Sequence, residues 1–129
     1  MRTGSVGNRS ADDIVNTLPK EKKQVISSVR KLLLDRGLLE DVEYDSINIE
    51  PVLKYSKSES DVVFLRHKWE LTAMIPVQAP QMITYAEKIF KEKISEYLFI
   101  DENGNRWIKF NLPEAEEELR RVMDELFTA

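Results

Sequence analysis

The stretch FLRHKWELTAM, residues 64–74, contains the one histidine of the chain, His67, between Arg66 and Lys68 and two residues before Trp69. An imidazole can act as a general base near neutral pH, and an indole ring can stack on a planar ligand. If a strand runs unbroken through this stretch, His67 and Trp69 share one face, because strand side chains alternate. If the chain turns here, His67 and Lys68 fill the end of a hairpin and Trp69 covers an edge of the core. We favour the hairpin and keep a recognition surface as the alternative.

Five residues are our candidates for binding a ligand. Tyrosines can line a pocket between a sheet and its helices, although they also occur at the rim of a core. The candidates are Arg66, His67, Trp69, Tyr44 and Tyr55.

Catalytic signatures are sparse. A hydrolase built on His67 would need a nucleophile such as Ser58 or Ser60, and neither serine is flanked by glycine. The chain has no glycine-rich loop before a helix to hold phosphate and no histidine pair at helical spacing to hold zinc. We therefore predict no catalytic residue and no cofactor.

Acidic residues gather in two regions, and close carboxylates can ligate a hard cation. The first region is typical of a solvated strand edge and contains Glu40, Asp41, Glu43 and Asp45. The second is the closing helix, where Arg121 can pair with Glu117 or Glu118, and Arg120 with Glu116, at helical spacing. We therefore predict no metal site in either region.

Composition restricts the class of protein. The chain has 129 residues, 42% of them hydrophobic and 33% charged, a formal net charge of −4 and no cysteine. This length fits one domain, and the negative charge argues against a nucleic-acid partner. The apolar runs are too short to span a membrane, and residues 1–10 lack the apolar stretch of a secretory signal. We expect a cytoplasmic protein with no membrane association, as a monomer or weak homodimer.

Two helices are expected near the start. Ser10 and Asp13 have the spacing of a capping box, which predicts a short helix over residues 12–16. Pro19 suits the first turn of a second helix, and Gly37 suits its left-handed stop. Residues 1–9 are predicted to be a disordered tail, and residues 10–129 to form a single domain.

Strand patterns follow. VEYDSINIEPVLKYS, DVVFLR and WELTAMIPV indicate three or four antiparallel strands, with Pro51 breaking or bulging the first or placing it at an edge. A third amphipathic helix is expected after Pro80. Asn103 and Gly104 then predict a hairpin, because both tolerate positive φ. The last helix is expected directly after Asn111, with Pro113 in its first turn.

Each predicted helix has one apolar side, and the strands come in adjacent runs. The helices should therefore pack on one face of the sheet. The sequence predicts a two-layer α+β domain, with an antiparallel sheet and helices packed on one face.

Both ends of the chain resemble a known family. The opening ADDIVNTLPKEKKQVISSVRKLL and the closing WIKFNLPEAEEELRRVMDELF resemble the ends of the YdhG-like family of small α+β proteins. The resemblance implies the same fold class. One group in that family is similar to frataxin and is described as an iron carrier, so the resemblance also implies iron binding as a hypothesis.

Three functions remain from this sequence. The favoured one is a non-enzymatic module that binds a partner protein or a small molecule across the open face of the sheet. The second is a carrier of iron or another divalent metal through the acidic surface. An enzyme using His67 is the third.

Overall fold

The computed structural model describes residues 10–45, 49–58, 61–77 and 80–126. The predicted tail, residues 1–9, lies outside the described residues. The elements follow in the order α1 (Ala11–Asn16), α2 (Lys20–Leu34), β1 (Leu39–Asp45), β2 (Glu50–Ser58), β3 (Asp61–Arg66), β4 (Thr72–Pro76), α3 (Pro80–Phe90), the 3₁₀ helix η2 (Lys91–Glu96), β5 (Leu98–Ile100), β6 (Arg106–Asn111) and α4 (Glu116–Leu126). None of these helices is both long enough and apolar enough to cross a membrane.

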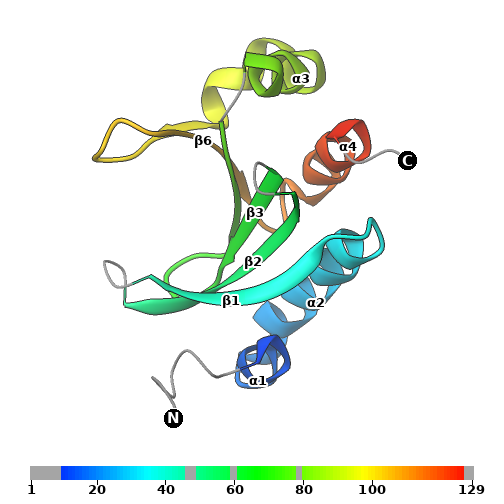
Figure 1. Cartoon of the computed structure of the whole chain (residues 1–129), viewed down its shortest axis with the longest axis vertical. Coiled ribbons are helices and arrows are strands. Elements are labelled where there is room, and N and C mark those ends of the chain that lie inside the picture. The colour runs from blue at the N-terminus through cyan, green and yellow to red at the C-terminus, as the bar shows by residue number, and fades with distance from the viewer. Residues whose placement is uncertain (1–9, 46–48, 59–60, 78–79, 127–129) are drawn as a thin grey trace.

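The six strands form one antiparallel sheet in the order β1-β2-β3-β4-β6-β5. Among the described residues, the helices lie on one side of the sheet and leave the other side, on the left in Figure 1, uncovered. The predicted two-layer α+β fold with an antiparallel sheet is therefore confirmed.

The core lies between the sheet and the helices. Strand residues that alternate toward the helices are completely buried, among them Leu53, Leu65 and Phe110, and they meet the apolar sides of α2 and α4. From α2, Ile26, Val29 and Leu33 have no exposed surface, as the three- and four-residue spacing predicts.

The ends of the first two helices largely follow the sequence rules. Ser10 and Asp13 form the predicted capping box around the start of α1. Gly37, with φ of +84°, supplies the left-handed turn after α2. Pro19 is not inside the first turn as predicted; it is the N-cap residue that precedes Lys20.

The first predicted strand is two strands. The run VEYDSINIEPVLKYS is divided between β1 and β2, which pair so that Tyr44 lies opposite Pro51. Asp45 pairs with Glu50, so the chain direction reverses between these two residues. β2 is an interior strand, yet β3 pairs with it only from Leu53 onward. Pro51 therefore lies beyond the end of β3, where its missing N–H removes no bond to that strand.

The β5–β6 hairpin forms where Asn-Gly predicts it, but its turn differs from the prediction. Gly104 has φ of +84°, whereas the only described non-glycine residues with positive φ are Ile49 and Lys91, so Asn103 does not take that conformation. Asp101 Oδ1 instead accepts hydrogen bonds from the amides of Asn103 and Asn105, each at 2.9 Å. Together with the indole N–H of Trp107, these bonds hold the pKa of the Asp101 carboxyl below its usual value.

The closing helix begins later than the sequence predicts. Residues 112–115 form turns, and α4 starts at Glu116 rather than directly after Asn111. Pro113 is consequently outside the helix. Leu112 and Ala115 are buried in these turns, so packing of the connection against the core delays the start of the helix.

Candidate functional site

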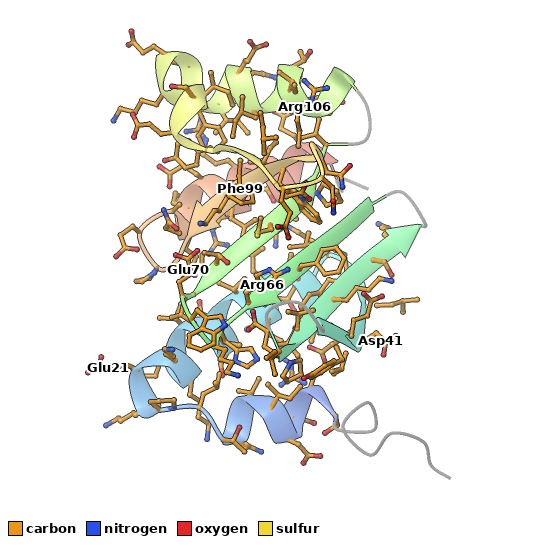
Figure 2. All side chains as sticks on the ribbon, turned by 90° about the vertical axis from the view of Figure 1, so that its left-hand side faces the viewer. Glu21, Asp41, Arg66, Glu70, Phe99 and Arg106 are labelled. Carbon is orange, nitrogen blue, oxygen red and sulfur yellow. The ribbon has the colours of Figure 1, made fainter. Side chains whose placement is uncertain are left out.

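The uncovered face of the sheet carries large side chains that are not part of the main core. Strand alternation places Phe64 and Arg66 of β3, Met74 of β4, and Trp107 and Lys109 of β6 on this face. Figure 2 looks onto it and shows Arg66, Glu70 and Phe99 over the sheet. Phe64 and Trp107 meet edge to face, with ring centroids 5.8 Å apart.

A hollow of about 280 Å³ lies on this face. It combines aromatic, apolar and charged residues from β2, β3, the β3–β4 connection, β4, β5 and β6. Its lining residues are Glu50, Arg66, Trp69, Glu70, Met74, Phe99 and Lys109. Small-molecule sites usually have this mixture of apolar surface and a few placed polar groups.

Glu50 is the buried anion of the hollow, with 1% of its surface exposed. Its Oε1 lies 3.0 Å from NH1 of Arg66, and its Oε2 accepts a hydrogen bond from the Lys68 amide at 3.1 Å. A buried carboxylate needs such partners because burial removes it from water. These bonds fix the connection after β3 against the start of β2.

Two exposed aromatic rings flank the charged groups. Trp69 is 69% exposed and Phe99 is 39% exposed. Lys68 Nζ lies 4.9 Å from the centroid of the Trp69 ring, and Lys109 Nζ lies 5.3 Å from that of Phe99. Lys109 also pairs with Glu70 at 2.6 Å. The prediction that Trp69 covers an edge of the core is therefore wrong, because this ring lies largely in solvent.

His67 is at a hairpin end, as the favoured interpretation had it, but it is not a solvated turn residue. Only 7% of its surface is exposed. Extending the β2–β3 register by two residues places it opposite Pro51, and its Nε2 lies 2.9 Å from the Pro51 carbonyl oxygen. Lys22 of α2 donates a hydrogen bond to the His67 carbonyl at 2.9 Å. His67 does not line the hollow, and its geometry is that of a structural residue.

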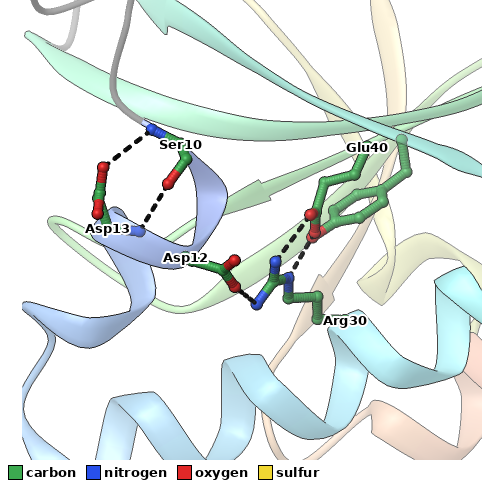
Figure 3. A network of polar contacts seen from close by, with 6 residues as sticks. Ser10, Asp12, Asp13, Arg30 and Glu40 are labelled. Carbon is green, nitrogen blue, oxygen red and sulfur yellow. Dashed lines mark hydrogen bonds and ion pairs between the residues drawn. The ribbon is translucent and has the colours of Figure 1, made fainter.

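Tyr55 lies on the opposite side of the sheet from the hollow. It is completely buried in the core, and its hydroxyl donates a 2.6 Å hydrogen bond to Glu40. Arg30 binds the same carboxylate through Nε at 2.5 Å and NH2 at 2.8 Å, and its NH1 lies 2.8 Å from Asp12. Figure 3 shows this network, which joins α1 and α2 to β1.

Hydrogen bonds within this network keep Glu40 ionised although it is partly buried, and they keep Tyr55 protonated. Burial opposes the charged form of Glu40, yet the hydrogen bonds from Arg30 and Tyr55 outweigh it and hold the pKa of this carboxyl below its usual value. Burial and the bond to Glu40 raise the pKa of the Tyr55 hydroxyl, which keeps it a donor. Glu40 binds both Arg30 and Tyr55. The network therefore fits a structural role.

The five ligand-binding candidates predicted from the sequence therefore lie in different parts of the structure. Arg66 and Trp69 line the hollow, His67 is buried beside it, Tyr55 is in the core, and Tyr44 is half-exposed on the edge strand β1. Sequence reasoning missed five lining residues, namely Glu50, Glu70, Met74, Phe99 and Lys109. Their separation along the chain hides them, and only the strand register brings them together.

Acidic side chains of the closing helix pair differently from the prediction. Arg120 lies 3.3 Å from Glu117 rather than pairing with Glu116, which accepts a 2.7 Å hydrogen bond from the Ser28 hydroxyl. Asp124 pairs with Arg36, and Glu125 lies 3.3 Å from Lys88. Across the described ranges, no group of three or more histidine, aspartate or glutamate side chains is arranged to hold a metal ion.

Comparison with known proteins finds no matching family model, no matching curated protein and no matching solved structure. The resemblance of the chain ends to the YdhG-like family stays a prediction.

Proposed function

We propose that this protein is a non-enzymatic binding module that takes a small planar ligand in the hollow between Trp69 and Phe99. The observation that carries the proposal is the exposure of these two rings, at 69% and 39%, around a concave part of the uncovered sheet face. Stacking on such rings releases water from apolar surface on both partners.

The charges of the hollow support a ligand with little net charge. Glu50 is bound to Arg66, and Glu70 is bound to Lys109, so the two anions and two cations sum to zero. A strongly charged ligand would have to separate one of these pairs. Polar atoms on a neutral ring can instead exchange hydrogen bonds with the outer groups, Glu70 and Lys109.

His67 gives no support to the enzyme alternative, because it is buried and its Nε2 is engaged by the Pro51 carbonyl. A general base must reach the proton that it removes. The binding module is therefore the function that this geometry favours.

A screen of neutral planar fragments by saturation-transfer NMR tests the proposal. We expect a subset, with indole and adenine as the first probes, to bind the wild-type protein and to lose at least fivefold in affinity with Trp69→Ala. The matched control is Tyr44→Ala, which removes a half-exposed aromatic ring outside the hollow. Equal loss in both variants, or no binding by any fragment, would refute the proposed function.

A further inference from the structure

The strand β5 is an edge of the sheet, since in the described part of the chain it pairs only with β6, in the order β1-β2-β3-β4-β6-β5. The backbone N–H of Lys109 donates to the Tyr97 carbonyl at 2.7 Å, and the backbone N–H of Asp101 donates to the Asn105 carbonyl at 2.9 Å. Hydrogen-bonding direction alternates along an antiparallel strand. The N–H and C=O groups of the alternate residues, Leu98 and Ile100, therefore point away from β6.

This edge is also apolar on both faces. Leu98, Phe99 and Ile100 are 36%, 39% and 65% exposed. Edge strands usually carry charges, proline or a bulge that discourages further pairing. The other edge strand, β1, has four acidic residues among seven, whereas β5 is protected only by its length of three residues and carries no charge, proline or bulge. The hairpin that contains β5 projects from the sheet on the side away from the helices (Figure 1).

We propose that β5 binds an extended segment of a partner protein as an added strand, and that this segment is apolar at alternate positions with lysine or arginine at its ends. The outward groups of Leu98 and Ile100 supply the backbone hydrogen bonds. The apolar side chains of β5 contact those of the added strand. Strand addition to an open sheet edge is a general mode of peptide recognition.

Charge decides between a partner segment and a second copy of this chain. Residues 96–102 include Glu96, Asp101 and Glu102 and no basic residue. A second copy paired antiparallel about Phe99 would place Glu96 beside the partner copy's Glu102 at both ends, and like charges repel. A segment with basic ends meets the same acidic residues favourably.

This surface is distinct from the ligand hollow, and the proposal does not rest on the proposed function. Only Phe99 belongs to both, because its side chain alternates onto the uncovered face while those of Leu98 and Ile100 alternate toward the helix side.

The test uses the full chain and a synthetic seven-residue peptide with a lysine at each end and alternating valine and threonine between them. We expect chemical-shift changes in ¹⁵N–¹H NMR spectra at Leu98 and Ile100, and at least tenfold slower hydrogen exchange of both amides at saturation. A peptide with glutamate at both ends should bind at least fivefold more weakly at low ionic strength. The same lysine peptide, N-methylated at the residues that face β5, should not bind.

Two protein variants complete the design. Ile100→Pro removes an outward donor and should weaken binding at least fivefold, while Ile100→Val keeps that donor and should bind like the wild type. Trp69→Ala should leave peptide binding unchanged. Shifts that centre on Arg66 and Trp69, equal binding of the N-methylated peptide, or protection of Leu98 that rises with protein concentration without peptide would each overturn the proposal. The peptide arms decide the matter even if Ile100→Pro does not fold.

Discussion

His67 holds two separate parts of the fold together. Its ring meets the Pro51 carbonyl of β2, and its own carbonyl accepts a hydrogen bond from Lys22 of α2. His67 is the one histidine of the chain, and the sequence alone favours a hairpin end for it and leaves a recognition role as the alternative. Burial of the ring shows why a structural role fits better, and burial is a property that residue type and spacing alone do not reveal.

We predict that His67→Ala lowers the free energy of unfolding by about 1–3 kcal/mol, because it removes a buried side chain and leaves the Pro51 carbonyl without this donor. Urea denaturation followed by circular dichroism measures the change. Trp69→Ala is the control, and its largely exposed ring should contribute within about 0.5 kcal/mol to stability. Equal effects of the two substitutions would contradict the structural role of His67.

Glu40 provides a second test of the contribution of a single side chain to stability. The pKa of its carboxyl is lowered in the folded protein, so its stabilisation is present above the unfolded-state pKa of about 4.3 and is lost as the pH falls through the lower folded pKa. We predict that Glu40→Gln costs about 2 kcal/mol at pH 7. The cost should shrink as the pH is lowered below about 4.

Unfolding measured at pH 7 and at pH 3 checks this dependence. Glu43→Gln is the matched control, since that carboxylate belongs to the more exposed pair with Lys54 and should contribute within about 1 kcal/mol. A cost of Glu40→Gln that stays constant over this pH range would show that charge is not the source of its contribution.

The predicted helix ends are correct where the sequence signal depends only on neighbouring residues. The capping box at Ser10 and the left-handed Gly37 depend on neighbouring residues alone, and both are present. Asn111 and Pro113 also form a good local helix start, yet α4 begins at Glu116 because Leu112 and Ala115 are buried first. Tertiary packing overrides a local signal of modest strength at that position.

The conformation of the β5–β6 turn predicts the effect of a substitution at Gly104. Gly104 has φ of +84°, so Gly104→Val should lower the free energy of unfolding by about 1 kcal/mol or more, through backbone strain alone, because no atom lies within 4 Å of the added Cβ. Thermal unfolding measures it. Asn103→Val in the same turn is the control, because Asn103 lacks positive φ. A melting temperature left unchanged by Gly104→Val would contradict this turn geometry.

At the scale of the whole molecule, the fold class follows from the pattern of one-sided helices and adjacent strands. The hollow does not, because its residues come from positions between 50 and 109 and meet only through the register of β2, β3, β4, β6 and β5. Arg66 and Trp69 were within reach of sequence reasoning because they lie near one distinctive histidine. No such signal marks Glu50, Phe99 or Lys109.

We propose that a planar ligand binds on the uncovered face between Trp69 and Phe99. The most direct measurement is a ¹⁵N–¹H NMR titration of the full chain with a fragment selected by the screen, following amides and the two indole N–H signals. We expect saturable shifts at the Trp69 indole and at the amides of Arg66, Met74 and Phe99, all absent in Trp69→Ala. Shifts confined to the helix-covered side of the sheet, or retained in Trp69→Ala, would contradict it.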